Sequence, residues 1–346
     1  MALLAGCGQA SQVQSELPKT DQAGKAVPSL TLDPTAAARL PLTNRSFLMG
    51  TAGYVPRHYP DPSEEDWTEF FREGAAAYGG LFGVHVNPGD DPGTDGIPQQ
   101  VALAFENMSG IEPYVAFAVN HEEGPFTVEQ GEQLMQAAVA TAERYHPRFL
   151  SLGVESNSLY LFEPDSFDLY VQYAREIYDA VKTVSPDTLI MNNFQLERMM
   201  GKTALTGQDF PPHWELISQF EGKIDLVSFT VYPFLHYQTP REIPADYLQE
   251  IREHTDLPLM ITETGWPTKP TASGVSGSEE DQTAFLLKLV RQADDLDAAA
   301  VIWVFPHDAE FRIAGGIFDS ISLRTNEGAP KTAFSYWQAL LSLPTR

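Results

Sequence analysis

The chain has 346 residues, of which 43% are hydrophobic and 11% aromatic, so it can bury a large core. Its formal net charge is −25, from 47 acidic and 22 basic residues. A surface of this charge repels polyanions, which argues against nucleic acid or an anionic membrane surface as the main partner.

The single cysteine of the chain, Cys7, lies in the run Leu-Ala-Gly-Cys at residues 4–7. This run resembles a bacterial lipobox, in which the cysteine thiol carries a lipid. Residues 8–44 are rich in Gln, Ser, Ala, Pro and Thr, which is typical of a flexible linker. We therefore expect residues 1–7 to be the remainder of a lipoprotein signal and Cys7 to be the lipid attachment site. The protein would then be an extracytoplasmic, membrane-anchored bacterial lipoprotein. An ordinary N-terminus of small residues is the alternative.

From residue 45 to 346, short apolar runs alternate with amphipathic stretches, which is typical of βαβ units. Helices are expected at 64–78, 128–145, 166–184, 245–254 and 279–296. Strands are expected at 47–53, 81–87, 114–120, 149–155, 188–194, 226–232, 259–263 and 300–305. Eight repeats predict a single (β/α)8 TIM barrel. A doubly wound open sheet is disfavoured because no glycine-rich phosphate turn leads from the first strand into a helix.

The chemistry of such a barrel lies at the carboxyl ends of its strands. Most of the expected strands end in polar or aromatic residues, which suit the hydroxyls and the apolar face of a sugar ring. The candidate substrate-binding residues are Tyr54, His85, Asn120, Asn157, Asn193, Tyr232, Trp266 and Trp303.

Two expected strands end in an acid, Glu155 and Glu263. With period-two alternation, Gly153 shares the face of Glu155, and Leu259 and Ile261 share the face of Glu263, so both acids are expected to point into the barrel mouth. The fourth and seventh strands face each other across that mouth, so the carboxyl groups are expected roughly 5 Å apart, a separation that suits retaining glycoside hydrolysis. One acid must be protonated and the other ionised. The alternative for either acid alone is a rim salt bridge.

The run ITETGWP at 261–267 resembles the nucleophile motif of family 17 β-glucanases, and VYPF at 231–234 resembles their Tyr-Pro-Phe segment. The segment 316–331 is similar to the last barrel unit of clan A glycoside hydrolases, and a weaker similarity extends to family 53 galactanases. The resemblance spans about residues 46–340. It implies Glu263 as nucleophile, Glu155 as acid/base, Tyr232 as the residue that holds the nucleophile, and Trp303 as a sugar platform. The implied activity is retaining hydrolysis of an extracellular β-linked poly- or oligosaccharide.

One position departs from that clan, in which an asparagine directly precedes the acid/base and bonds the 2-hydroxyl of the sugar. Val154 stands there in this chain. Asn157, Asn120 or Asn193 could supply the amide instead. Otherwise the substrate differs at that carbon, or the protein binds sugar without cutting it.

The sequence contains no His-x-x-x-His pattern, no Cys/His cluster and no Gly-x-Ser-x-Gly elbow. We therefore expect no metal, no cofactor and no esterase chemistry. The expected partner is a carbohydrate, bound by a monomer. The alternative function is a cell-surface lipoprotein that binds glycan on a catalytically weak or inactive barrel.

Overall fold

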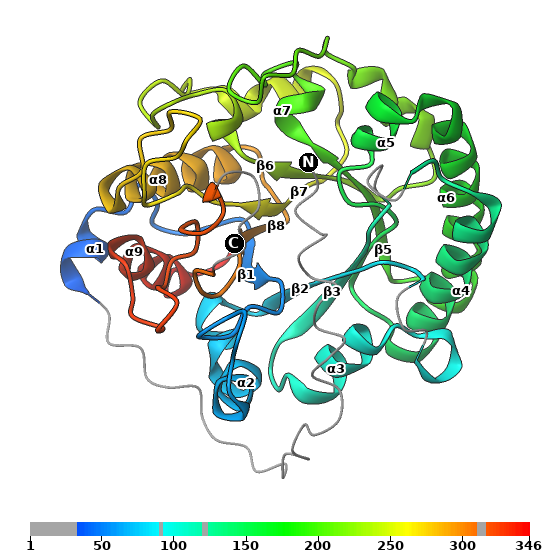
Figure 1. The fold of residues 1–346 in the computed structure, drawn as a ribbon, viewed down its shortest axis with the longest axis horizontal. Coiled ribbons are helices and arrows are strands. Elements are labelled where there is room, and N and C mark those ends of the chain that lie inside the picture. Colours follow the sequence, from blue (N-terminus) through cyan, green and yellow to red (C-terminus); the bar gives the residue numbers. More distant parts are fainter. Residues whose placement is uncertain (1–32, 90–92, 120–123, 310–315) are drawn as a thin grey trace.

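The computed structural model describes residues 33–89, 93–119, 124–309 and 316–346, and it confirms the expected (β/α)8 barrel (Figure 1). Every neighbouring pair of strands is parallel, and β1 pairs with β8 to close the ring. The strands follow one another around the barrel in chain order: β1 (Leu48–Ala52), β2 (Leu81–Val86), β3 (Glu112–Phe117), β4 (Phe149–Ser151), β5 (Leu189–Gln195), β6 (Leu226–Val231), β7 (Leu259–Thr264) and β8 (Ala300–Val304).

Helices surround this ring (Figure 1). The expected helix at 64–78 is a short α-helix followed by π and 3₁₀ turns, and the one at 245–254 is the 3₁₀ helix η8 (Tyr247–Glu253). Side-chain caps begin several helices: Thr127 and Gln130 form a capping box at the start of α4, and Ser278 caps α8. The α-helices are α1 (Pro34–Ala38), α2 (Glu64–Glu69), α3 (Gln99–Asn107), α4 (Val128–Tyr145), α5 (Asn157–Phe162), α6 (Pro164–Val184), α7 (Leu196–Met199), α8 (Glu279–Asp295) and α9 (Thr332–Leu341).

The described structure begins inside the expected linker. Helix α1 contacts α9, and its Ala36 is buried. The chain then reaches β1 from the amino-terminal end of the barrel, where Arg45 bonds the carbonyl oxygens of Leu340 and Phe47. The folded part therefore starts before residue 45, while Cys7 and most of the linker lie outside the described residues. None of the described helices is long and apolar enough to cross a membrane.

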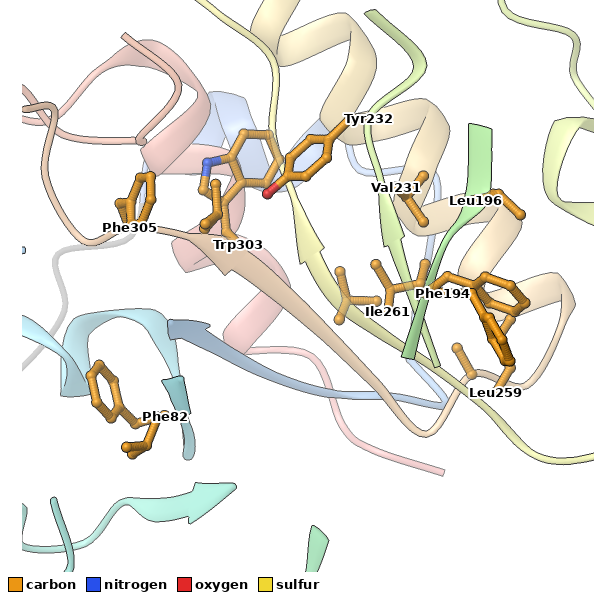
Figure 2. Packing of buried hydrophobic residues seen from close by; sticks show 14 of the residues in the cluster. Phe82, Phe194, Leu196, Val231, Tyr232, Leu259, Ile261, Trp303 and Phe305 are labelled. Atoms are coloured by element: carbon orange, nitrogen blue, oxygen red, sulfur yellow. The ribbon is translucent and has the colours of Figure 1, made fainter. Parts of the chain in front are cut away.

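Side chains of the strands form two separate apolar layers. The inner layer fills the barrel and includes Tyr114, Met191, Met260 and Ile302, and the outer layer lies between the strands and the helices. Leu259 and Ile261 belong to the outer layer, where Figure 2 shows them beside Phe194 and Val231. The expectation that Leu259 and Ile261 share the face of Glu263 was therefore wrong, because Met260 is the β7 residue that faces inward.

Candidate active site

Glu155 lies in a turn rather than at the end of a strand, because β4 stops at Ser151. Its backbone is left-handed, with φ of +49°, a conformation that a residue other than glycine adopts only when its surroundings hold it there. Asn193 on β5 supplies that support. The side-chain oxygen of Asn193 accepts the Glu155 N–H at 2.8 Å, and its backbone oxygen accepts the Ser156 N–H at 3.0 Å. This turn presents the Glu155 carboxylate at the barrel mouth.

Two residues that the sequence analysis missed contact the Glu155 carboxylate. The Thr230 hydroxyl on β6 donates to Oε1 at 2.8 Å, and Arg198 Nη1 in α7 lies 3.6 Å from Oε2 as an ion pair. Thr230 could have been found, because period two places it on the same face of β6 as Tyr232. Arg198 follows the end of β5 by three residues, and no periodicity indicates where its side chain points.

Glu263 reaches the barrel interior through an irregularity in β7. Ile261 pairs with Phe229 on β6, but the next pair joins Glu263 to Thr230, so Thr262 is an extra residue in β7. A bulge of this kind changes which side of the sheet the following residue faces. Because Thr230 points inward, its partner Glu263 does too. Glu263 therefore points inward, as expected, but the bulge at Thr262 causes this orientation and simple alternation along the strand does not.

Glu263 is only 2% exposed, and each oxygen of its carboxylate has a polar neighbour. The Tyr232 hydroxyl donates to Oε2 at 2.7 Å, the contact that the family resemblance implied, and His85 Nδ1 lies 3.1 Å from Oε1. Burial, and then the charge of Glu155, raise the pKa of Glu263 to about 8, while the Tyr232 hydroxyl opposes this rise. Thr230 joins the two carboxyl groups in one site, because its hydroxyl bonds Glu155 and its backbone pairs with Glu263.

The asparagines proposed to replace the missing amide are occupied by protein contacts. Asn157 is fully buried, and its side chain bonds both the N–H and the carbonyl oxygen of Gln195 at 2.9 and 3.0 Å. The side-chain oxygen of Asn193 accepts the Glu155 N–H, and its side-chain nitrogen donates to the hydroxyl of Thr262. Both residues hold the strands of the site in place, so assigning them to sugar binding is not supported by their contacts.

Val154 itself packs in the inner layer with Phe149 and Met191. An asparagine at this position would have to bury its amide among apolar side chains. Asn120, the remaining candidate, lies outside the described residues.

The two tryptophans predicted to contact sugar are corrected by the structure. Trp303 is fully buried and points outward, because its neighbour Ile302 faces the barrel interior. Its indole N–H donates to the Ile321 carbonyl oxygen at 2.9 Å, and its ring packs near Trp337 of α9. Trp266 is also fully buried and donates to the Ser276 carbonyl oxygen. Neither ring can serve as a platform for a sugar.

Tyr54 and His85 also have protein partners. The Tyr54 hydroxyl donates to the Gln100 carbonyl oxygen, and its ring packs against Phe70 and Phe82. His85 has one ring nitrogen against Glu263 and the other 2.8 Å from the Tyr114 hydroxyl. Tyr54 thus packs against the outer layer and His85 lies beside Glu263, while the expected substrate contact of each stays a prediction.

A third buried carboxylate, Glu197, lies beside the acid pair and was not expected. It accepts the Tyr232 N–H at 3.0 Å and the Tyr247 hydroxyl at 2.9 Å, and a third donor comes from the Gln195 side chain. Burial raises the pKa of Glu197 to about 7, against the effect of these donors. Glu197 thus fixes the end of β6, from which Tyr232 reaches Glu263. Within the described ranges, no three His, Cys, Asp or Glu side chains gather as a metal would require.

The fold and the site define a (β/α)8 barrel with two buried acids joined through Thr230, and its structural neighbours include glycoside hydrolases. One is the family 17 β-1,3-glucanosyltransferase from Rhizomucor miehei, at 15% identity and a TM-score of 0.58, with 87% of this chain and 98% of that chain covered.

A family 39 glycoside hydrolase from Bacteroides cellulosilyticus matches at 16% identity and a TM-score of 0.55, over 85% of this chain and 63% of that one. A family 2 β-galacturonidase from Eisenbergiella tayi matches at 16% identity and a TM-score of 0.52, over 77% of this chain. This chain spans less than half of the galacturonidase, at 46%. No family model and no curated protein sequence matches the chain.

Proposed function

We propose that this protein is a retaining glycoside hydrolase that cleaves a β-linked poly- or oligosaccharide, with Glu263 as nucleophile and Glu155 as acid/base. The observation that carries the proposal is that two buried carboxyl groups meet at Thr230, whose hydroxyl bonds Glu155 and whose backbone pairs with Glu263. Retaining hydrolysis requires two such groups on opposite sides of the scissile bond. The names of the neighbouring structures, which include a β-1,3-glucanosyltransferase and a β-galacturonidase, support a β-linked substrate.

In the first step, Glu155 gives its proton to the leaving oxygen while Glu263 attacks the anomeric carbon. The Tyr232 hydroxyl at Oε2 and the His85 ring at Oε1 orient the Glu263 carboxylate for this attack. In the second step Glu155 takes a proton from water, which hydrolyses the glycosyl ester. The ion pair with Arg198 stabilises the negative charge that Glu155 carries after the first step.

The decisive experiment incubates the purified protein with a panel of β-linked polysaccharides and measures reducing-end release and binding in parallel. We expect Glu263→Ala to abolish release, and azide to restore turnover with a glycosyl azide of inverted configuration. Near wild-type release by Glu263→Ala would show that the nucleophile assignment is wrong. Micromolar binding without release by the wild-type protein would favour the glycan-binding alternative.

We also propose that a lipid on Cys7 anchors the protein outside the bacterial cell. The supporting observation is that the chain joins β1 at the end of the barrel opposite the acid pair, so an anchored barrel would keep its mouth accessible. Mass spectrometry of the native protein should find acyl chains on Cys7, and Cys7→Ser should release it from membranes. An unmodified Cys7 would contradict the anchor without bearing on catalysis.

A further inference from the structure

His85 on β2 forms the middle of a chain of three side chains beneath the catalytic pair. Its Nδ1 lies 3.1 Å from Oε1 of Glu263, and its Nε2 lies 2.8 Å from the hydroxyl of Tyr114. The His85 side chain is 6% exposed, and Tyr114 is fully buried inside the barrel. The chain therefore joins β3, β2 and β7, and Tyr114 is its buried end.

The space for this arrangement comes from Gly83, which pairs with Tyr114 in the β2–β3 ladder. A Cβ atom at Gly83 would lie 2.6 Å from Cε1 of Tyr114 and 2.7 Å from the Cβ of Ala52. Both distances are too short for real side chains. The absence of a side chain at Gly83 therefore allows the Tyr114 ring to lie under His85.

The contacts of the Tyr114 hydroxyl bear on which nitrogen of His85 carries its proton. The hydroxyl lies 2.8 Å from His85 Nε2 and 3.3 Å from the Thr262 carbonyl oxygen. We assign its hydrogen to Nε2, the shorter of the two contacts. Burial lowers the pKa of His85 to about 4, so at neutral pH the ring has one proton, which is then on Nδ1. In this tautomer the proton-bearing Nδ1 is the nitrogen that lies 3.1 Å from Oε1 of Glu263.

We propose that Tyr114 is a positioning residue that fixes His85 as the Nδ1–H tautomer, and that this N–H favours the ionised form of Glu263 against burial and orients the carboxylate for attack. The inference rests on the proposed function and deepens it. Ionised Glu263 then accepts one hydrogen bond at each oxygen, from Tyr232 and from His85. The geometry follows the logic of a catalytic triad, in which a third group sets the tautomer of a histidine.

The charges around Glu263 determine the direction of the expected pH effect. Burial and the negative charge of Glu155 favour the protonated form of Glu263, and Arg198 is engaged with Glu155. Burial raises the pKa of Tyr114 and of Tyr232, so both stay neutral donors. Loss of the His85 N–H would therefore leave Glu263 protonated up to a higher pH.

The first test measures the tautomer in the free protein by NMR with ¹⁵N-labelled histidine. The chain has eight histidines, so His85→Asn is used to assign the His85 signals. We expect a protonated Nδ1 and an unprotonated Nε2 at pH 7, and a shift of the proton toward Nε2 in Tyr114→Phe. A wild-type His85 with its proton on Nε2 would overturn the proposal. This measurement needs no substrate, so it decides the proposal even if the protein cleaves no glycan, a result that would contradict only the proposed function.

The second test compares pH profiles of kcat/KM. We expect Tyr114→Phe to move the acid limb up by about one pH unit, which lowers kcat/KM about tenfold below that limb. In His85→Asn the side-chain amide lies near the position of the lost Nδ1. In His85→Gln it lies near the position of the lost Nε2. His85→Asn should therefore keep more activity than His85→Gln, and Tyr114→Phe should add no further shift to His85→Asn.

His307→Gln is the control, because His307 is also enclosed by the fold but bonds the Val55 carbonyl oxygen rather than Glu263. We expect it to leave the acid limb unchanged, whatever it does to stability. The proposal is overturned if the Tyr114→Phe profile superimposes on the wild type, or if Tyr114→Phe shifts the His85→Asn profile equally.

Discussion

The Thr230 hydroxyl donates to the Glu155 carboxylate at 2.8 Å, and the Thr230 backbone faces Glu263 across the β6–β7 ladder. One residue of β6 thus touches Glu155 directly and sets the position of Glu263 through strand pairing. Asn193 has a parallel role on β5, since its side chain bonds the backbone of Glu155 and the hydroxyl of Thr262. The relative positions of the two acids are therefore determined by polar side chains inside the barrel.

Thr230→Val should lower kcat while leaving the fold intact, because valine keeps the shape of threonine and removes only the donor. We expect a loss of about tenfold to a hundredfold, the scale of one hydrogen bond to a charged group. The control is Thr51→Val, which removes a buried hydroxyl that bonds the Trp303 carbonyl oxygen on β8. An unchanged kcat for Thr230→Val would show that this contact does not assist Glu155.

Asn157→Ala should act mainly on stability, because both hydrogen-bonding groups of the Asn157 side chain are used on the backbone of Gln195. We expect the free energy of unfolding in urea to fall by about 1–3 kcal/mol, the cost of leaving buried backbone groups unpaired. The folded variant should lose less than about tenfold in kcat. A large loss of kcat at unchanged stability would restore Asn157 as a sugar contact.

Lys331→Met should be strongly destabilising. The ammonium group of Lys331 is buried and bonds Asp308 at 2.7 Å, together with the carbonyl oxygens of Ser320 and Ser322. Burial raises the pKa of Asp308 to about 6, and Lys331 opposes this rise. Removing the cation leaves a buried carboxylate without its partner, at a cost of about 3–5 kcal/mol in unfolding free energy.

The double variant Asp308→Asn/Lys331→Met supplies the control for that measurement. Because it removes both charges, it should be more stable than Lys331→Met alone. If the double variant is the less stable of the two, the hydrogen bonds of Lys331 to the carbonyl oxygens matter more than its charge.

The raised pKa of Glu197 predicts that the stability of the protein depends on pH. Its pKa rises from 4.5 to about 7 on folding because of burial, so the folded state holds the proton more tightly than the unfolded chain. The stabilisation from this group is complete below about pH 4.5 and is lost as the pH rises through about 7. Glu197→Gln cannot titrate, so its Tm should improve relative to the wild type between pH 5 and pH 8. A Tm difference that is constant over this range would contradict the shifted pKa.

The sequence by itself determined the barrel, because alternation of short apolar runs with amphipathic stretches depends on local residue pattern alone. It also determined that Glu155 and Glu263 follow buried strands and that Tyr232 ends another. Each of these features is encoded within a few neighbouring residues, and the structure retains them with small changes of boundary.

Only the tertiary structure decided which way the side chains point. The extra residue Thr262 in β7 exists because Glu263 pairs with Thr230, about thirty residues away, and it turns Glu263 inward although Leu259 and Ile261 face the helices. Trp303 points away from the mouth because Ile302 takes the inner position on β8. A one-residue change of register reverses every side chain that follows it, and register is set by contacts between strands distant in the sequence. For that reason, local pattern could predict the acids but not the contacts that position them.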